Sequence, residues 1–146
     1  MRVFKAFNHA FIVSKPWQPH SLDALEHIHQ HKTGALFRAC LKLGVLAAGG
    51  SSELLDRLDV YGRCFGLVFQ ITDDLIDVEG NAADTGKRVG KDAARGKLTY
   101  PGVLGAAESR RRAERLGREA CQQLEALGAA AARLKALVSY VLERDR

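Results

Sequence analysis

The chain has 146 residues, 47% of them hydrophobic, which is enough for one globular domain with a buried core. Its 22 basic side chains outnumber the 17 acidic ones, and the formal net charge of +5 favours an anionic partner without telling a small phosphate from a membrane or a nucleic acid. The 3 cysteines are widely spaced, which argues against a disulfide framework or a zinc site, so we expect a reducing, cytoplasmic protein.

The first predicted helix begins after a leader that contains prolines. Pro16 and Pro19 exclude a regular helix at the end of residues 1–20. Ser21 is a favourable N-cap, since its hydroxyl oxygen can accept a backbone N–H of the first helical turn. The apolar spacing that follows predicts a helix from there toward Lys32.

Two apolar helices are predicted next. Residues 33–50 carry only Arg38 and Lys42 as charges, so we expect a central helix there and not a surface one. A longer pattern runs over residues 52–79 and is predicted to end at Gly80.

Two glycines interrupt this longer pattern. Gly62 and Gly66 lie four residues apart in the sequence. On a helix that spacing puts both on one face, where the missing side chains allow another helix to approach closely. The alternative is that they only weaken the helix.

The C-terminal third is also predicted to be helical. Pro101 opens a helix that continues to Gly128, and a last helix follows. Its arginines alternate with glutamates and have no aromatic neighbours for stacking bases, so they indicate a solvated face and no nucleic-acid partner. These are Arg110, Arg111, Arg112, Arg115 and Arg118. The whole chain is predicted to be all-α, and no apolar run reaches the roughly 18 residues that a membrane span needs.

The end of the long helix carries residues suited to chemistry. On a helix, Gln70 and Asp77 project to the same side as Asp73 or Asp74, because steps of three and four residues nearly complete a turn. We therefore expect three carboxylates and one amide to share a face. Like charges at this spacing repel one another, and the apolar residues around them add a desolvation cost. A hard cation removes both penalties, and oxygen ligands without His or Cys suit Mg²⁺. The alternative is a set of acids that simply faces water.

The segment after this helix combines glycines with cations. Gly86, Gly90 and Gly96 permit backbone N–H groups to turn toward an anion, and Lys87 and Lys97 supply positive charge. The spacing of glycine and lysine does not match a P-loop, and the acidic residues are out of register for an EF-hand. We therefore expect an anion site that is split between a helix and a loop.

Three patches together resemble one known family. FQITDDLIDV over residues 69–78, followed by TGKRVGKDAARGKLTYP over residues 85–101, is similar to the second aspartate-rich motif and lysine loop of the trans-polyprenyl diphosphate synthases, which include farnesyl and geranylgeranyl diphosphate synthases. HIHQHKTGALF over residues 27–37 resembles that family's Lys-Thr helix break. The resemblance covers residues 21–146 and implies a partial helical bundle of the isoprenoid synthase type, with about five to six helices.

The resemblance implies a reaction in isoprenoid biosynthesis. An allylic diphosphate held by Mg²⁺ ionises to an allylic cation, which condenses with isopentenyl diphosphate. By position in the motif, Asp73 is the main metal ligand, with Asp74 and Asp77 in its inner or outer shell. The family resemblance therefore makes the chain a prenyltransferase, a transferase of alkyl groups.

The resemblance also implies roles for residues outside the acidic motif. Lys32, Lys87 and Lys97 contact the substrate diphosphate. Thr33 and Gln70 direct oxygen dipoles at the developing carbocation, so that Lys32, Thr33 and Gln70 form the catalytic group.

The chain departs from the family pattern in its N-terminal part. It has one Asp-Asp pair and no earlier aspartate-rich motif, and residues 1–20 do not resemble the family. We therefore predict a leader over 1–20 and, over 21–146, the C-terminal half of a synthase-like domain, which is inactive alone and forms a homo-oligomer or pairs with a chain that supplies the first motif. Two alternatives stay open. One is a subunit or regulator that complements another synthase chain, and the other is a basic α-helical anion-binding module without catalysis.

Overall fold

The computed structural model describes residues 21–83 and 98–144, and every regular element within them is helical. The elements are α1 (Leu22–His29), the π-helical turn η1 (Gln30–Gly34), α2 (Ala35–Ala47), α3 (Ser52–Ala83), α4 (Tyr100–Leu104), α5 (Ala106–Gln123), the 3₁₀ segment η3 (Glu125–Ala131) and α6 (Ala132–Glu143). The predicted all-α class is confirmed. The leader over 1–20 lies outside the described residues, so its separate status stays a prediction.

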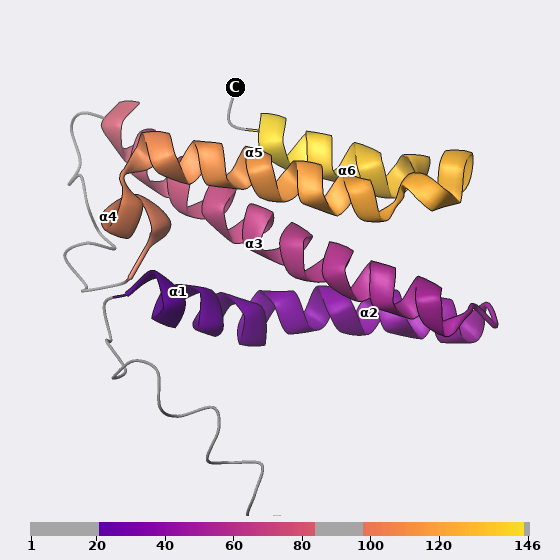
Figure 1. Cartoon of the computed structure of the whole chain (residues 1–146). Helices are drawn as coiled ribbons and strands as arrows, with labels where there is room; N and C mark the ends of the chain where they lie inside the picture. The colour runs from indigo at the N-terminus through magenta and orange to yellow at the C-terminus, as the bar shows by residue number, and fades with distance from the viewer. Residues whose placement is uncertain (1–20, 84–97, 145–146) are drawn as a thin grey trace, which may run out of the picture.

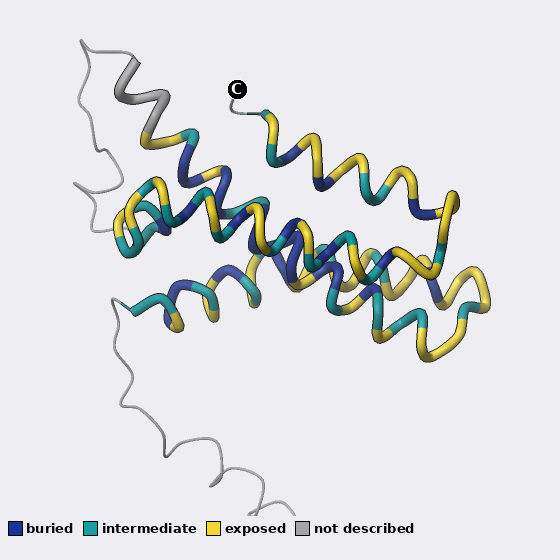
Figure 2. Tube along the Cα trace, turned by 45° about the horizontal axis from the view of Figure 1, so that its top comes forward, coloured by how far each residue is buried: buried dark blue, intermediate teal, exposed yellow. Residues whose placement is uncertain are grey.

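All the other α-helices pack around α3. It contacts α1, η1 and α2 on one side and α4, α5 and α6 on the other, and Figure 1 shows it running between these two groups. Its buried side chains recur at steps of three and four residues, which lines one broad stripe of the helix with apolar groups. These residues are Leu58, Tyr61, Phe65, Val68, Ile71 and Leu75. The core of the molecule therefore lies along α3, as the dark blue segments in Figure 2 indicate.

Local sequence signals place most helix starts but not every helix end. The hydroxyl oxygen of Ser21 accepts the Ala24 N–H at 3.2 Å, which confirms the predicted N-cap. The predicted end of α3 at Gly80 is wrong, because the helix continues to Ala83. A glycine inside a helix costs only about 1 kcal/mol relative to alanine, which a long cooperative helix can tolerate. The predicted single helix from Pro101 to Gly128 is also interrupted, at Gly105, whose φ of 79° is left-handed.

The helix predicted to be central, α2, is exposed along one side. Leu36, Leu43 and Leu46 are 64%, 67% and 55% exposed. The prediction of a central helix is wrong for the described structure, because burial on all sides needs neighbours on all sides and the described elements cover α2 mainly with α3. None of the described helices combines the length and the hydropathy of a membrane span.

A contact between two backbones joins η1 to α3. A Cβ atom added to Gly66 would lie 2.8 Å from the Cα of Gly34, and one added to Gly62 would lie 2.9 Å from Cδ1 of Leu41. Carbon atoms in proteins do not approach so closely, so the glycines are what allows the rod of α1, η1 and α2 to lie directly on α3. The predicted close approach at Gly62 and Gly66 is confirmed.

We expect Gly66→Ala to lower the free energy of unfolding by about 1 to 3 kcal/mol, because the backbone of Gly34 cannot yield as the end of a side chain can. Gly44→Ala in α2 is the matched control. An added Cβ there meets nothing within 4 Å, so the substitution should stabilise the fold by up to about 1 kcal/mol through helix propensity. Urea unfolding followed by circular dichroism measures both, and equal effects would contradict the close approach.

Candidate functional site

The C-terminal part of α3 presents two of the predicted metal ligands together. Asp73 and Asp77 are both exposed, and their spacing of four residues puts them on one face, one turn apart. Gln70 is half-buried and precedes Asp73 by three residues. This face carries two carboxylates and an amide oxygen, where the sequence predicts three carboxylates and an amide.

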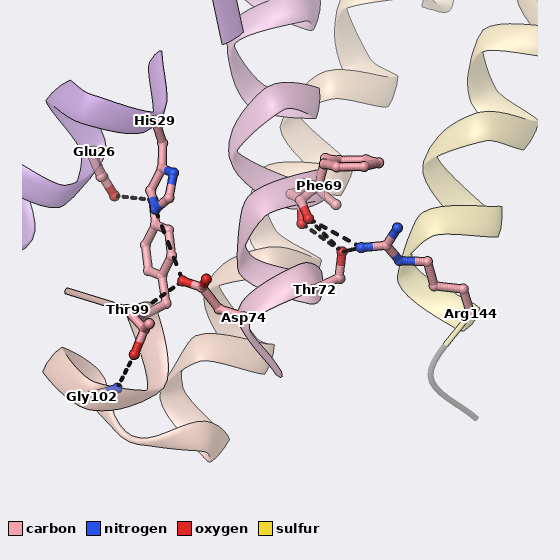
Figure 3. Close-up of polar contacts among 10 residues, drawn as sticks. Glu26, His29, Phe69, Thr72, Asp74, Thr99, Gly102 and Arg144 are labelled. Atoms are coloured by element: carbon pink, nitrogen blue, oxygen red, sulfur yellow. Dashed lines mark hydrogen bonds and ion pairs between the residues drawn. The ribbon is translucent and has the colours of Figure 1, made fainter. Parts of the chain in front are cut away.

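Asp74 points the other way, toward α1 and α4. It is 3% exposed, its Oδ2 accepts the backbone N–H of Tyr100 at 3.0 Å, and the same oxygen lies 4.0 Å from Nε2 of His29 (Figure 3). Adjacent residues on an α-helix differ by about 100° around the axis, so Asp74 cannot share the face of Asp73. The prediction that three carboxylates share one face is therefore wrong for Asp74, and its place among the metal ligands stays a prediction.

A partly buried polar network surrounds Asp74. The phenol of Tyr100 donates to Oε1 of Glu26 at 3.4 Å, and the guanidinium of Arg112 donates to the same carboxylate through two nitrogens. Burial and then the charge of Glu26 raise the pKa of Tyr100, so its hydroxyl stays protonated and can donate. The ring of His29 stacks on that of Tyr100 with centroids 5.6 Å apart. The network joins α1, α4 and α5, and Arg112 is a structural residue there instead of part of a solvated face.

The predicted Lys-Thr helix break is a π-helical turn. Within η1, Lys32 is exposed and Thr33 is half-buried, while α1 and α2 continue on either side. A π-turn widens the helix locally without ending it, and such turns are frequent at functional sites. The break that the family resemblance predicts thus corresponds to a local distortion of the helix.

Packing of η1 on α3 brings this turn beside the acidic face. The turn meets α3 at Gly66, and Gln70 lies one helical turn further toward Asp73. With a rise of 1.5 Å per residue, about 10 Å of α3 separates Gly66 from Asp73. The predicted catalytic turn and the predicted metal-binding face are therefore neighbours in space, although they are distant in the sequence.

The last described residue adds a contact that sequence reasoning missed. Arg144, at the end of α6, reaches α3 and lies 3.5 Å from Oδ1 of Asp73 (Figure 3 shows its bonds to Phe69 and Thr72). An arginine near the end of an amphipathic pattern cannot be told from a solubilising charge, so the sequence offered no signal for it.

The remaining predicted ligands of a substrate lie outside the described structure. Lys87 and Lys97 fall in residues 84–97, so their roles stay predictions. Among the described residues no three side chains of the His, Cys, Asp or Glu types converge in a group that could hold a metal ion. Burial, followed by the nearby Glu119 carboxylate, raises the pKa of the Cys64 thiol to about 12, so this cysteine is no thiolate ligand or nucleophile near neutral pH.

Comparison with known proteins assigns the chain to a family. Residues 12–139 match the family model of polyprenyl synthetases. The chain belongs to the polyprenyl synthetase family. The match begins within the predicted leader, whereas the resemblance in the sequence was drawn from residue 21 onward. It includes η1 and the whole acidic face of α3, so the elements described above are parts of a polyprenyl synthetase.

Relatives and solved structures agree with this assignment but are longer. The chain is 47% identical over 121 residues to geranylgeranyl pyrophosphate synthase 11 of Arabidopsis thaliana, covering 82% of this chain and 34% of the relative. It is 44% identical over 129 residues to farnesyl diphosphate synthase of Escherichia coli, covering 86% of this chain and 43% of the relative. A crystal structure of a geranyltransferase from Helicobacter pylori, complexed with magnesium and isoprenyl diphosphate, superposes with a TM-score of 0.63 and 33% identity, covering 85% of this chain and 41% of that structure. The chain thus spans less than half the length of each.

The orientation of Asp74 makes a testable distinction from its neighbour. We expect Asp74→Ala to lower the free energy of unfolding by about 1 to 3 kcal/mol, because it leaves the buried N–H of Tyr100 without its acceptor. Asp73→Ala removes only a half-exposed ion pair and should change stability by less than about 1 kcal/mol. Urea unfolding of both variants decides the matter, and equal losses would contradict the separate roles.

Proposed function

We propose that this chain is a polyprenyl diphosphate synthase-like protein of isoprenoid biosynthesis whose α3 and η1 bind the diphosphate of an allylic substrate through Mg²⁺. The observation that carries the proposal is the packing of the Lys32–Thr33 turn on α3 at Gly66, about two helical turns before the exposed Asp73 on the same helix. Membership of the polyprenyl synthetase family supports it. The geranyltransferase of Helicobacter pylori, crystallised in complex with magnesium and isoprenyl diphosphate, supports it as well.

The donor set of this face fits Mg²⁺. Two carboxylates one turn apart, with no His or Cys grouped with them among the described residues, are oxygen ligands of the kind that a hard cation prefers. Mg²⁺ commonly takes only one or two protein carboxylates and completes its shell with substrate phosphates and water, so a third converging side chain is not needed. Asp73 and Asp77 would hold the ion directly. Asp74 would act behind them, by fixing the position of α3 against Tyr100.

Each predicted residue has a task in this site. Mg²⁺, when bound, neutralises charge on the leaving diphosphate as a Lewis acid. Lys32 from η1 would contact the diphosphate, and Lys87 and Lys97 would contribute further positive charge from the segment after α3. Thr33 and Gln70 would turn oxygen dipoles toward the carbocation that remains, which fixed dipoles in a site poor in water can stabilise.

The reaction of the complete site follows from these tasks. The bond between the allylic carbon and the diphosphate oxygen breaks, and the electron pair leaves with the diphosphate. The allylic cation then adds to the double bond of isopentenyl diphosphate, and loss of a proton restores a double bond in the longer product. Catalysis requires that the negative charge of the leaving diphosphate and the positive charge of the allylic cation are stabilised at the same time, which no single residue can do.

The chain by itself is proposed to bind and not to turn over. Its one Asp-Asp pair provides one metal-binding face, whereas the family resemblance assigns most diphosphate ligation to an earlier motif. The exposed apolar side of α2, with Leu36, Leu43 and Leu46, supports the same conclusion, because such a face is suited to contact with further helices.

A subunit role is the second candidate. One relative, 44% identical over 125 residues, carries the name heterodimeric geranylgeranyl pyrophosphate synthase large subunit 1 of Arabidopsis thaliana. A partner chain that supplies the first aspartate-rich motif and packs on the apolar side of α2 would complete the site in trans. A homo-oligomer would cover the same side without completing the site.

We expect binding of a non-hydrolysable allylic diphosphate analogue to require Mg²⁺ and to be lost in Asp73→Ala, which removes the main carboxylate ligand. Ca²⁺ should substitute poorly, because a site with few protein carboxylates cannot fill its larger coordination shell. Isothermal calorimetry with and without chelator measures this. Equal binding of the analogue in the presence and absence of chelator would contradict the metal-site proposal.

We expect this chain alone, supplied with an allylic diphosphate, isopentenyl diphosphate and Mg²⁺, to form no longer product. Loss of one preorganised charge-stabilising group can cost on the order of 10²-fold to 10³-fold in rate, and here a whole metal-binding helix is not provided. Addition of an N-terminal half from a related synthase should restore product formation in the same radiolabel assay. Turnover by a monodisperse monomer of this chain would contradict the half-site proposal.

A further inference from the structure

Arg144 reaches from the end of α6 to Phe69 and Thr72 of α3 (Figure 3). Its Nη2 donates to the carbonyl oxygen of Phe69 at 3.3 Å and lies 3.1 Å from Oγ1 of Thr72, and its Cζ lies 4.6 Å from the centroid of the Phe69 ring. The same nitrogen is 3.5 Å from Oδ1 of Asp73. The match to the family model ends at residue 139, before Arg144.

The guanidinium is held more firmly by Phe69 and Thr72 than by Asp73. Two hydrogen bonds and a contact with an aromatic face fix a planar guanidinium in one orientation. The side chain of Arg144 is 20% exposed, whereas that of Asp73 is 53% exposed and can turn in solvent. The positive charge therefore stays in place when the carboxylate of Asp73 takes up another partner.

Stability alone does not account for this arrangement. The Nε of Arg144 is buried and has no hydrogen-bond partner in the described part of the chain. A buried donor without an acceptor opposes folding, and such groups call for a separate explanation. Here the same side chain touches the carboxylate that is proposed to bind metal.

We propose that Arg144 is a positioning residue that orients Asp73 through Oδ1 and places a fixed positive charge beside the metal and the diphosphate. This inference rests on the proposed function. A fixed positive charge repels a bare divalent cation at Asp73 but attracts the diphosphate that comes with it. Arg144 thereby makes the site select metal with diphosphate over metal alone.

The test compares two affinities that should move in opposite directions. Mn²⁺ alone is titrated by electron paramagnetic resonance, and inorganic pyrophosphate is titrated by calorimetry in excess Mg²⁺. We expect Arg144→Gln to tighten Mn²⁺ binding roughly three-fold or more and to weaken pyrophosphate binding roughly five-fold or more, because one nearby charge is lost. Arg144→Lys keeps the charge but not the planar guanidinium, and it should give smaller shifts than Arg144→Gln with the same signs.

Arg111→Gln on α5 is the matched control, because Arg111 is an exposed arginine paired with Glu108 and makes none of the contacts of Arg144 with the acidic face. It should leave both affinities unchanged. Circular dichroism verifies the folding of each variant. Should Arg144→Gln not fold, Thr72→Val loosens the guanidinium while keeping its charge, and it should give smaller shifts with the same signs.

The outcomes separate this inference from the function on which it rests. If the wild type binds pyrophosphate with Mg²⁺ and Arg144→Gln shifts neither affinity, or lowers both, Arg144 has no positioning role and the inference fails alone. If the wild type does not bind pyrophosphate with Mg²⁺ at all, the proposed function fails and the inference fails with it.

Discussion

The arrangement of the candidate site depends on the contact between the backbones of Gly34 and Gly66. Because Gly66 has no side chain, η1 lies directly on α3, and the rod of α1, η1 and α2 follows it. A Cβ atom on Gly66 would push the whole rod away, since the backbone of Gly34 cannot move aside by changing a rotamer. The contact also sets the spacing between the Lys32–Thr33 turn and the acidic residues, and through this spacing it links packing to the proposed chemistry.

Asp73 and Asp74 are adjacent in the sequence but have different roles: Asp74 stabilises the fold, and Asp73 is the proposed metal ligand. Asp73 faces solvent and the end of α6, while Asp74 is buried and holds the first residue of α4. That second contact fixes the position of Tyr100 at the start of α4. A carboxylate in the core is costly unless its hydrogen bonds are satisfied, and the network of Tyr100 and its neighbours meets this need. The same pair of acids thus supports the scaffold and supplies the proposed ligand.

The apolar side of α2 is exposed in a chain that is shorter than its relatives. Leu36, Leu43 and Leu46 stay exposed in a chain that spans 34% to 43% of the curated relatives described above. Apolar area of this kind is stabilised when water is removed from it, so further helices of a synthase, in the same or another polypeptide, are its natural cover in the proposed function. The proposed loss of activity in isolation and the exposed face of α2 would then have one origin.

The sequence by itself determined the helical class, the cap at Ser21, the close approach at Gly66 and the pairing of Asp73 with Asp77, because each of these depends on steps of three or four residues along one helix. Family patterns added the Lys-Thr turn. Only the tertiary structure decided that Asp74 turns inward, that Arg144 meets the acidic face and that one side of α2 stays exposed. The contacts of Asp74 and Arg144 join residues that lie 26 and 72 positions apart in the chain. Periodicity states which face of a helix a residue occupies, but what lies against that face depends on how distant segments pack.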